Sequence, residues 1–289
     1  MTALGKILVI RFSSIGDIVL TTSFITTLRK TFPNFEIHYL TLDKFSSILE
    51  FHPEIDRVIE LNSNSNLKDL LEFNKFIKSS NYNRIFDLHG SIRSRLITKG
   101  IGQSISRVKK PRFLRFILFQ FHINMFPSNF SAMHMYHNCL EENESIEFPK
   151  TFLSVSDLEQ KNAISFLKKN NVEGRFIAIV PGAAWPQKQW GVAKYSKAIT
   201  KIISRSNKSV VLLGTEKDKI NNEIEKINNQ VVNLTGKTNL RQAMSVLSLS
   251  DTVLGSDTGL VHIAEALGKS VNMILGPTTK ETGGGVSLS

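Results

Sequence analysis

The chain has 289 residues, of which 41% are hydrophobic, and a formal net charge of +11. This size allows one large or two ordinary domains with a buried core. The single cysteine, Cys139, excludes an internal disulfide framework and a metal site built from several thiolates, and it is typical of a reducing cytoplasm. No apolar run reaches the length of a membrane span, and the apolar stretch at the N-terminus is too short for a signal peptide.

Strand-like and helix-like segments alternate through the first half of the chain. Helices are predicted at 17–31 and 67–78, with a short helix after the second strand. Strands are predicted at 6–12, 36–42, 57–61 and 84–90. This alternation indicates a parallel sheet with helices on both faces.

The same alternation restarts in the second half of the chain. Helices are predicted at 157–170, 195–204, 219–227 and 260–267. Strands are predicted at 175–182, 209–214, 231–236, 252–257 and 270–276. We therefore expect two α/β domains, 1–154 and 155–289, with ligands outside the carboxyl ends of the strands.

The stretch RFSSIGDIVL, residues 11–20, follows the first predicted strand. It places two serines, a glycine and the carboxylate of Asp17 between an apolar strand and an apolar helix. Two interpretations are open at this point. Asp17 either caps the helix or is a catalytic acid or base directed into a cleft.

The positive charge is concentrated between residues 88 and 140, where the chain has no Asp or Glu. Five phenylalanines interleave with basic residues in PRFLRFILFQFHINMF. Basic and aromatic residues together suit a membrane interface or an anionic amphiphile. Nucleic acid would also fit the charge, but no nucleic-acid motif accompanies it. The alternative is an ordinary core helix with a solvated basic face. The basic residues are Arg93, Arg95, Lys99, Arg107, Lys109, Lys110, Arg112 and Arg115.

Three strand ends in the second half carry polar motifs. They are PGAAWPQKQW (181–190), GTEKD (214–218) and GSDTGLVHIAEALG (255–268). In the first, Lys188 lies between the two tryptophans of the chain and could neutralise phosphate charge, although a loop lysine is usually just solvated. In the second, Asp218 could hold ribose hydroxyls or could simply cap a helix.

The third motif begins a helix directly after a strand. Asp257 and Thr258 are good capping residues, and Gly259 permits close backbone approach. A helix start of this kind has free N–H groups and the positive end of the helix dipole, which suit phosphate. A capped helix without a ligand is the alternative, and His262 in its first turn could equally be a packed or surface histidine.

Several common motifs are absent from the sequence. There is no G-x-G-x-x-G after the first strand and no G-x-x-x-x-G-K-[ST], which argues against a dinucleotide oxidoreductase and a P-loop NTPase. There is no H-E-x-x-H or G-x-S-x-G for zinc or acyl chemistry.

A specific family resemblance emerges from four segments in this order. They are KILVIRFSSIGDIVLTTSFITTLRKTFPNFEIHYLT, IVPGAAWPQKQWGVAKYSKAI, VVLLGTEKDK and GSDTGLVHIAEALG. Together they resemble the heptosyltransferases, the glycosyltransferases that build the inner core of lipopolysaccharide. Smaller matches are DLHGSIRS and HMYHNCLEE, and the similarity covers most of the chain, through Gly276-Pro277-Thr278.

The resemblance implies a GT-B fold of two Rossmann-like domains that face a central cleft. The N-terminal domain would bind a lipid-linked anionic acceptor and the C-terminal domain a nucleotide sugar. It also implies inverting transfer of heptose from ADP-heptose without a metal or other cofactor, at the cytoplasmic face of the inner membrane. The general base would be Asp17, in a turn shaped by Ser13, Ser14 and Gly16. Donor contacts would come from Lys188, Asp218, Asp257, Thr258, Gly259 and His262, and acceptor contacts from Lys109, Lys110 and Arg112.

The sequence departs from the family at its end. The chain stops at KETGGGVSLS, before the last strand and helix that are usual in the family. This short end leaves open a non-catalytic binder of nucleotide sugars or anionic lipid. A transferase that uses another nucleotide sugar also stays open, because donor choice rests on a few pocket residues that the motifs do not fix.

Overall fold

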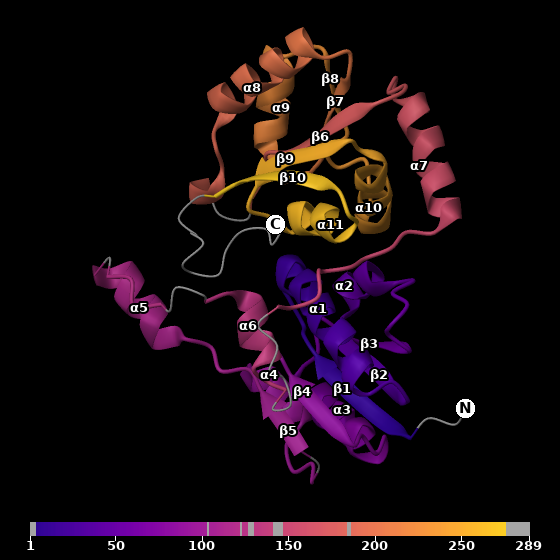
Figure 1. Ribbon diagram of the computed structural model, residues 1–289, viewed down its shortest axis with the longest axis vertical. Helices are drawn as coiled ribbons and strands as arrows, with labels where there is room; N and C mark the ends of the chain where they lie inside the picture. Colours follow the sequence, from indigo (N-terminus) through magenta and orange to yellow (C-terminus); the bar gives the residue numbers. More distant parts are fainter. Residues whose placement is uncertain are drawn as a thin grey trace. The chain divides into compact units, whose positions relative to one another are not determined.

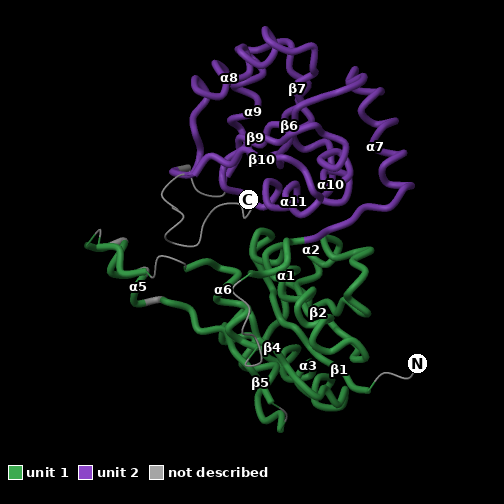
Figure 2. Tube along the Cα trace, viewed as in Figure 1, with its two compact units in different colours: residues 1–151 green, residues 152–289 purple. Residues whose placement is uncertain are grey.

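The computed structural model describes residues 4–275 except 103, 122, 127–129, 141–146 and 184–185. Within this range the side chains of Arg112, Arg115, Phe119 and Pro186 are outside the description. The chain divides into two compact units, unit 1 (Met1–Thr151) and unit 2 (Phe152–Ser289), as Figure 2 shows. The division falls just before the boundary expected after residue 154. The assignment of acceptor and donor to the two units stays a prediction, as does a cleft between them.

Unit 1 contains a five-stranded parallel sheet in the order β3-β2-β1-β4-β5. Its strands are β1 (Gly5–Ile10), β2 (Phe35–Leu42), β3 (Arg57–Leu61), β4 (Arg84–Asp87) and β5 (Ser104–Arg107). The central strand β1 pairs with β2 and β4, and its Ile7, Leu8, Val9 and Ile10 are fully buried. A parallel strand that is buried on both faces requires such a continuous apolar run, which explains why the sequence identified it.

Helices cover both faces of this sheet (Figure 1). On one face, α3 and α4 supply Leu70, Ile77 and Ile97 to a core with Leu8 and Ile10. On the other face α1 packs against α6. The helices of unit 1 are α1 (Ile15–Thr31), α2 (Asp43–Ser46), α3 (Leu67–Ser79), α4 (Ile92–Ile97), α5 (Arg112–Phe121) and α6 (Ala132–His137), with a short 3-10 turn η1 (Ser47–Leu49).

The basic aromatic segment forms α5, and three of its phenylalanines are exposed. The exposed fractions are 70% for Phe113, 57% for Phe116 and 59% for Phe121. The interpretation of this segment as an ordinary core helix is therefore wrong for these positions. In the described part of the chain, no helix has the length and apolarity needed to cross a membrane.

Unit 2 contains a second five-stranded parallel sheet, in the order β10-β9-β6-β7-β8. Its strands are β6 (Phe176–Val180), β7 (Ser209–Leu212), β8 (Val231–Asn233), β9 (Thr252–Ser256) and β10 (Ser270–Ile274). Its helices are α7 (Asp157–Lys169), α8 (Val192–Arg205), α9 (Lys219–Ile227), α10 (Leu240–Leu249) and α11 (Gly259–Ala266), with a 3-10 turn η2 (Pro186–Lys188). Figure 1 shows α8 and α9 on one face and α10 and α11 on the other.

Several predicted strands end earlier than the sequence suggested. The strands predicted at 84–90, 209–214 and 231–236 end at Asp87, Leu212 and Asn233. In each case a leucine directly follows the strand, and Leu88, Leu213 and Leu234 are fully buried. These leucines extend the apolar run into the turn, so hydrophobicity alone misplaces the strand end. The turns after the strands carry the candidate site residues.

Candidate functional site

Asp17 lies in the first turn of α1, directly after the end of β1. Its Oδ2 accepts hydrogen bonds from the backbone N–H of Ser14 at 3.2 Å and from Ser14 Oγ at 2.8 Å. The same oxygen lies 2.6 Å from Nη2 of Arg11. Its Oδ1 accepts a hydrogen bond from the hydroxyl of Tyr136 at 2.8 Å. The helix-cap interpretation is therefore confirmed, because the carboxylate is bonded to the residue that precedes α1.

The cap interpretation does not account for all of the surroundings of Asp17. Its side chain remains 33% exposed, while the side chain of Arg11 is only 6% exposed. A surface cap would not need a buried guanidinium. The arrangement fits a carboxylate with a fixed orientation that a ligand can still reach.

Arg11 links the ends of two neighbouring strands. Its Nε donates to the carbonyl of Ser13 at 2.7 Å, and its Nη1 donates to the carbonyl of Leu88 at 2.7 Å. Its guanidinium also lies over the ring of Tyr136, 5.4 Å from the centroid. Arg11 therefore holds the turn after β1 and the turn after β4 together around Asp17.

These contacts change the pKa of Asp17. Burial alone would raise this pKa, but the positive charge of Arg11 and the hydrogen bonds from Tyr136 and Ser14 lower it below the ordinary value. Each of these groups favours the ionised carboxylate. Asp17 is therefore a carboxylate, not a carboxylic acid, at neutral pH. It can accept a proton there but cannot donate one.

The turn after β4 brings a neutral histidine near this carboxylate. The fully buried Asp87 accepts hydrogen bonds from the backbone N–H groups of His89 at 3.1 Å and Gly90 at 2.8 Å, which fixes the turn. Burial, assisted by the charge of Arg11, lowers the pKa of His89 to about 4. Its ring packs against Phe12 at 4.9 Å between centroids. His89 is uncharged at neutral pH.

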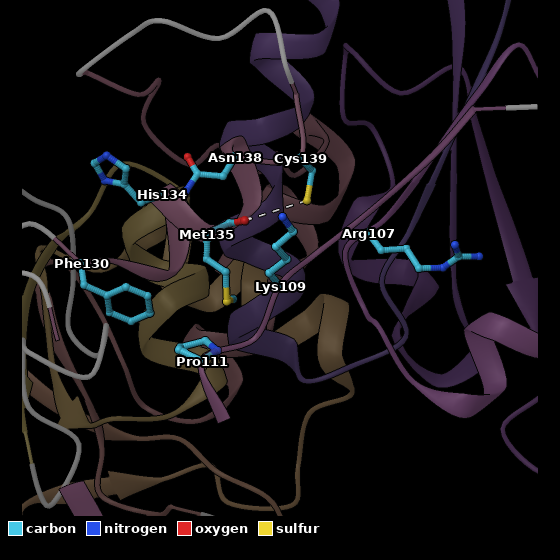
Figure 3. A pocket seen from close by; sticks show the side chains of 8 residues that line it. All are labelled: Arg107, Lys109, Pro111, Phe130, His134, Met135, Asn138 and Cys139. Atoms are coloured by element: carbon cyan, nitrogen blue, oxygen red, sulfur yellow. Dashed lines mark hydrogen bonds between the residues drawn. The ribbon is translucent and has the colours of Figure 1, made fainter. Parts of the chain in front are cut away.

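A pocket of about 440 Å³ lies beside α6 in unit 1 (Figure 3). Its wall combines apolar groups with Lys109, His134 and Asn138, and none of the described side chains that line it is acidic. Figure 3 shows Arg107 directed away from the other side chains, and this residue lies 3.5 Å from Asp87. The lining residues are Arg107, Lys109, Pro111, Phe130, His134, Met135, Asn138 and Cys139.

Six residues were predicted on the acceptor side, namely Ser13, Ser14, Gly16, Lys109, Lys110 and Arg112. Of the three basic ones, Lys109 lines the pocket, whereas Lys110 does not. The side chain of Arg112 lies outside the described residues. Ser13 contributes its carbonyl to Arg11, and Gly16 lies in the first turn of α1.

Unit 2 brings two of its three predicted motifs into direct contact. Nζ of Lys188, at the end of η2, lies 2.6 Å from Oδ2 of Asp257, which follows β9. Nε2 of His262, in α11, lies 3.3 Å from Oδ1 of the same carboxylate. Lys188 is 23% exposed and Asp257 is 10% exposed. The three side chains form a partly buried polar cluster; Trp185, beside it in sequence, is outside the described residues.

The third motif of unit 2 forms a tight turn. Oδ2 of Asp218 accepts hydrogen bonds from the backbone N–H of Thr215 at 2.6 Å and from its hydroxyl at 2.9 Å. A Cβ atom on Gly182 would lie 2.2 Å from Oδ1 of Asp218, and one on Gly214 would lie 2.8 Å from Oδ2. The glycines after β6 and β7 are therefore required for Asp218 to fit between these strand ends. Asp218 makes no side-chain cap to α9, although it stands at the N-cap position.

The start of α11 also matches the predicted geometry. Thr258 is its N-cap residue and gives no side-chain cap, and Gly259 begins the helix. The helices α3, α6, α7 and α10, in contrast, are capped by Asn or Ser side chains. The side chain of Thr258 thus does not cap the first N–H groups of α11, which lie beside the cluster of Lys188, Asp257 and His262.

Sequence reasoning missed Arg11, Tyr136 and His89. Arg11 gave a partial signal, because it is a charged residue at the end of an otherwise apolar strand. Tyr136 lies in the family match HMYHNCLEE, but nothing in the sequence pointed to its contact with Asp17, from which it lies 119 residues away.

Comparison with known proteins identifies the family. A family model described as glycosyltransferase family 9 (heptosyltransferase) matches residues 70–288. The lipooligosaccharide heptosyltransferase 2 of Haemophilus influenzae is 26% identical over 293 residues, which cover 96% of this chain and 84% of that protein. The lipopolysaccharide heptosyltransferase 2 of Escherichia coli K12 is 24% identical, with the same coverage of both chains.

Solved structures agree in fold. The glycosyl transferase family 9 structure from Veillonella parvula has a TM-score of 0.78 at 20% identity and covers 94% of this chain and 80% of that chain. The E. coli ADP-heptose lps heptosyltransferase II has a TM-score of 0.67 at 22% identity, with coverage of 93% and 84%. Two parallel α/β sheets with this likeness define the GT-B fold. The chain belongs to glycosyltransferase family 9, the heptosyltransferases.

Proposed function

We propose that this chain transfers heptose from ADP-heptose to the inner core of lipopolysaccharide with inversion, and that Asp17 is the general base. The observation that carries this proposal is the carboxylate of Asp17, which is ionised, fixed by four hydrogen-bond donors and 33% exposed at a strand end. The family supplies the reaction class. A similar solved structure, that of the E. coli heptosyltransferase WaaC with ADP, supports an adenine nucleotide.

The chemistry follows from these groups. Asp17 removes the proton of an acceptor hydroxyl while the hydroxyl oxygen forms a bond to the anomeric carbon. The bond from that carbon to the diphosphate breaks on the opposite face, and the nucleoside diphosphate leaves with the electron pair. Attack from the opposite face inverts the anomeric configuration. A positioned base contributes about 10²–10⁴-fold in rate.

The leaving diphosphate would be stabilised in unit 2. Lys188 and the N-terminus of α11 at Thr258 and Gly259 offer positive charge and N–H groups without a metal. Lys188 would exchange its partner Asp257 for a donor phosphate, and His262 would keep that carboxylate in place. Asp218 would hold the ribose hydroxyls. Turnover is accordingly expected to persist in a chelator.

The variant Asp17→Asn tests the base directly. Asparagine keeps the size of the side chain but cannot accept a proton at neutral pH, so turnover should fall by at least about 10²-fold. Donor affinity should stay within about threefold because Asp17 lies in unit 1. The assay is nucleoside diphosphate release with donor and a deep-core lipopolysaccharide acceptor. Turnover near the wild-type rate would falsify the role of Asp17.

The identity of the donor sugar and of its nucleotide base is the finer part of this proposal. A transferase specific for another nucleotide sugar would share the same polar groups, because they contact phosphate and ribose in either case. A panel of nucleotide sugars in the same assay separates the two possibilities. Nucleoside diphosphate release that needs both ADP-heptose and acceptor supports the proposal. Release that occurs only with another nucleotide sugar would show that this other sugar is the donor.

On the acceptor side, we propose that the pocket at α6 binds acidic groups of the acceptor and that α5 contacts the cytoplasmic face of the membrane. Lys109 supplies positive charge in the pocket, and the exposed Phe113 and Phe116 supply apolar contact. Interfacial contact of this kind requires no spanning helix.

The variant Lys109→Glu tests this acceptor side, with Lys99→Glu as its control. Both residues are exposed and belong to the acid-free segment, but only Lys109 lines the pocket. We expect Lys109→Glu to raise the KM for a delipidated acceptor by about tenfold, with donor KM unchanged. If the two variants have the same acceptor KM, the pocket does not bind the acceptor. Binding to anionic vesicles, measured in parallel, reports on the membrane contact alone.

A further inference from the structure

The two oxygens of the Asp17 carboxylate have unequal surroundings. Oδ2 faces three donors, the N–H and Oγ of Ser14 and Nη2 of Arg11. Among the described residues, Oδ1 faces one donor, the hydroxyl of Tyr136 at 2.8 Å. A carboxylate oxygen has two lone-pair directions, so the lone pairs of Oδ2 are occupied and Oδ1 keeps one available. The partial exposure of the side chain allows a substrate hydroxyl to reach that lone pair.

Tyr136 is built into the fold in a way that fixes its hydroxyl. It is fully buried, and its neighbours in α6 anchor the helix to α1. His137, the next residue, contacts Thr27 at 3.0 Å and packs against Phe24. Arg11 lies over the Tyr136 ring. Burial raises the pKa of Tyr136 well above its ordinary value, so the hydroxyl keeps its proton and donates a hydrogen bond to Asp17.

The charged and titratable groups around Asp17 come from four elements. Arg11 follows β1, Tyr39 lies in β2, His89 follows β4 and Tyr136 lies in α6. Of these, Arg11 and Tyr136 contact the carboxylate directly. Arg11 is always charged, and His89 is neutral at the pH of the assay.

We propose that Tyr136 is a positioning residue, which holds Oδ1 of Asp17 as the oxygen that accepts the proton of the acceptor hydroxyl. This inference rests on the proposed function of Asp17 and extends it to one atom and one partner. Without the hydroxyl of Tyr136, the carboxylate can rotate about its Cβ–Cγ bond and loses a donor that favours its ionised form. Both effects act on Asp17 and neither acts on the donor site.

The experiment compares Tyr136→Phe with Tyr39→Phe. Tyr39 is the matched control, because it is also fully buried and its hydroxyl bonds Thr21 at 2.6 Å rather than Asp17. Each variant removes one buried hydroxyl. Tyr136→Phe should lower kcat by about 10- to 100-fold and shift the acid limb of kcat/KM upward by about one pH unit. Tyr39→Phe should leave that limb in place, and the donor KM should be unchanged in both.

A measurement without turnover supports the kinetics. The pKa of Asp17 is followed through the ¹³C chemical shift of its carboxyl carbon, assigned with Asp17→Asn. It should rise in Tyr136→Phe and stay at the wild-type value in Tyr39→Phe. Equal pKa values and equal pH profiles in wild type and Tyr136→Phe would overturn the inference.

The same variants separate this inference from the proposed function. If Asp17→Asn is inactive while Tyr136→Phe keeps the wild-type kcat and acid limb, only the role of Tyr136 is overturned. If Asp17→Asn keeps turnover, the base assignment fails and the role of Tyr136 fails with it. If Asp17→Asn is inactive, and Tyr136→Phe has a lower kcat and a shifted acid limb while Tyr39→Phe has neither, the results support both the base role of Asp17 and the positioning role of Tyr136.

Discussion

In the proposed reaction, Asp17 would join two tasks that are usually carried by different residues. As the third residue of α1, it accepts the backbone N–H of Ser14 and closes the start of the helix. As a partly exposed carboxylate beside Arg11, it has the surroundings of a catalytic base. The tasks are compatible because they use different oxygens: the cap uses Oδ2 and leaves a lone pair of Oδ1 available.

The lowered pKa of Asp17 predicts the pH dependence of the reaction. Only the ionised carboxylate accepts a proton, so kcat/KM should be constant from pH 8 to about 5 and fall only as the pH approaches the lowered pKa, below the ordinary value of 3.8. His89, with a pKa of about 4, adds no inflection near pH 6.5. The measurement is kcat/KM against pH over the range in which the protein stays folded. An inflection between pH 6 and 7 would contradict this prediction.

The sequence brought together the local parts of the site, and the resemblance added Lys188 and Asp257, which lie far apart in sequence and are in contact. Asp17 and Ser14 belong to one short turn, and Asp257 and His262 to another, so spacing alone brought each pair together. Tyr136 reaches Asp17 only because α6 packs against α1, and that packing depends on contacts among distant residues. No local pattern contains this information.

Among the elements, α7 and α10 show how two helices of unit 2 are held together. Arg241 of α10 donates from Nε to Oε1 of Glu159 at 2.7 Å and from Nη2 to Oε2 at 2.5 Å. Its Nη1 also donates to the carbonyl of Ser154 at 3.1 Å. The planar guanidinium thus clamps α7 and the segment before it onto α10.

The variant Glu159→Gln measures this clamp. Glutamine retains the capping geometry at Ser156 but loses the charge, so we expect a loss of about 1.5–3 kcal/mol in the free energy of unfolding at pH 7. The hydrogen bonds from Arg241 lower the pKa of Glu159 to about 2. A lowered pKa stabilises the fold above the unfolded value near 4.5, and the contribution is lost as the pH falls towards 2.

Denaturant unfolding at several pH values checks this prediction, with the exposed Glu173→Gln as the control for loss of one charge. The difference between wild type and Glu159→Gln should shrink between pH 5 and pH 2. A difference that stays constant over this range would show that the ion pair does not stabilise unit 2.

The elements that sequence patterns missed are the ones with the weakest patterns. The strand β5, SISR, has four residues at the sheet edge and no fully buried side chain, so it has no apolar run. The helix α10 was not assigned because its serines and threonine-rich flanks resemble a loop, although Ala243, Met244, Val246 and Leu247 are buried. The strands β1 and β6, which consist mostly of buried residues, were predicted to within two residues at each end.

At the scale of the whole molecule, both units are basic. Lys and Arg outnumber Asp and Glu by 19 to 14 in unit 1 and by 17 to 11 in unit 2. The positive charge is therefore not confined to the aromatic segment near α5. Such a distribution favours anionic ligands on each unit and speeds their association at low salt. This agrees with a diphosphate donor on one unit and an acidic acceptor on the other.

Donor binding should appear as a change in the stability of the whole chain. A ligand that binds only the folded state stabilises it by about 2.7 kcal/mol at a concentration of 100 times its Kd. ADP without magnesium is therefore expected to raise the unfolding temperature of the wild type. Lys188→Ala should reduce this increase, whereas Lys197→Ala, an exposed lysine of α8, should not. An equal response in the two variants would remove Lys188 from the donor site.

The position of α6 between the pocket and Asp17 bears on how acceptor preference can evolve. His134, Met135, Asn138 and Cys139 line the pocket, while Tyr136 and His137 face α1. With the acceptor bound in this pocket as proposed, substitutions on the pocket side would change which sugar is accepted and leave Asp17 untouched. An insertion or deletion of one residue would rotate Tyr136 by about 100° and disconnect it from Asp17. Diversification in this lineage should thus proceed through point substitutions in α6, with its length held constant.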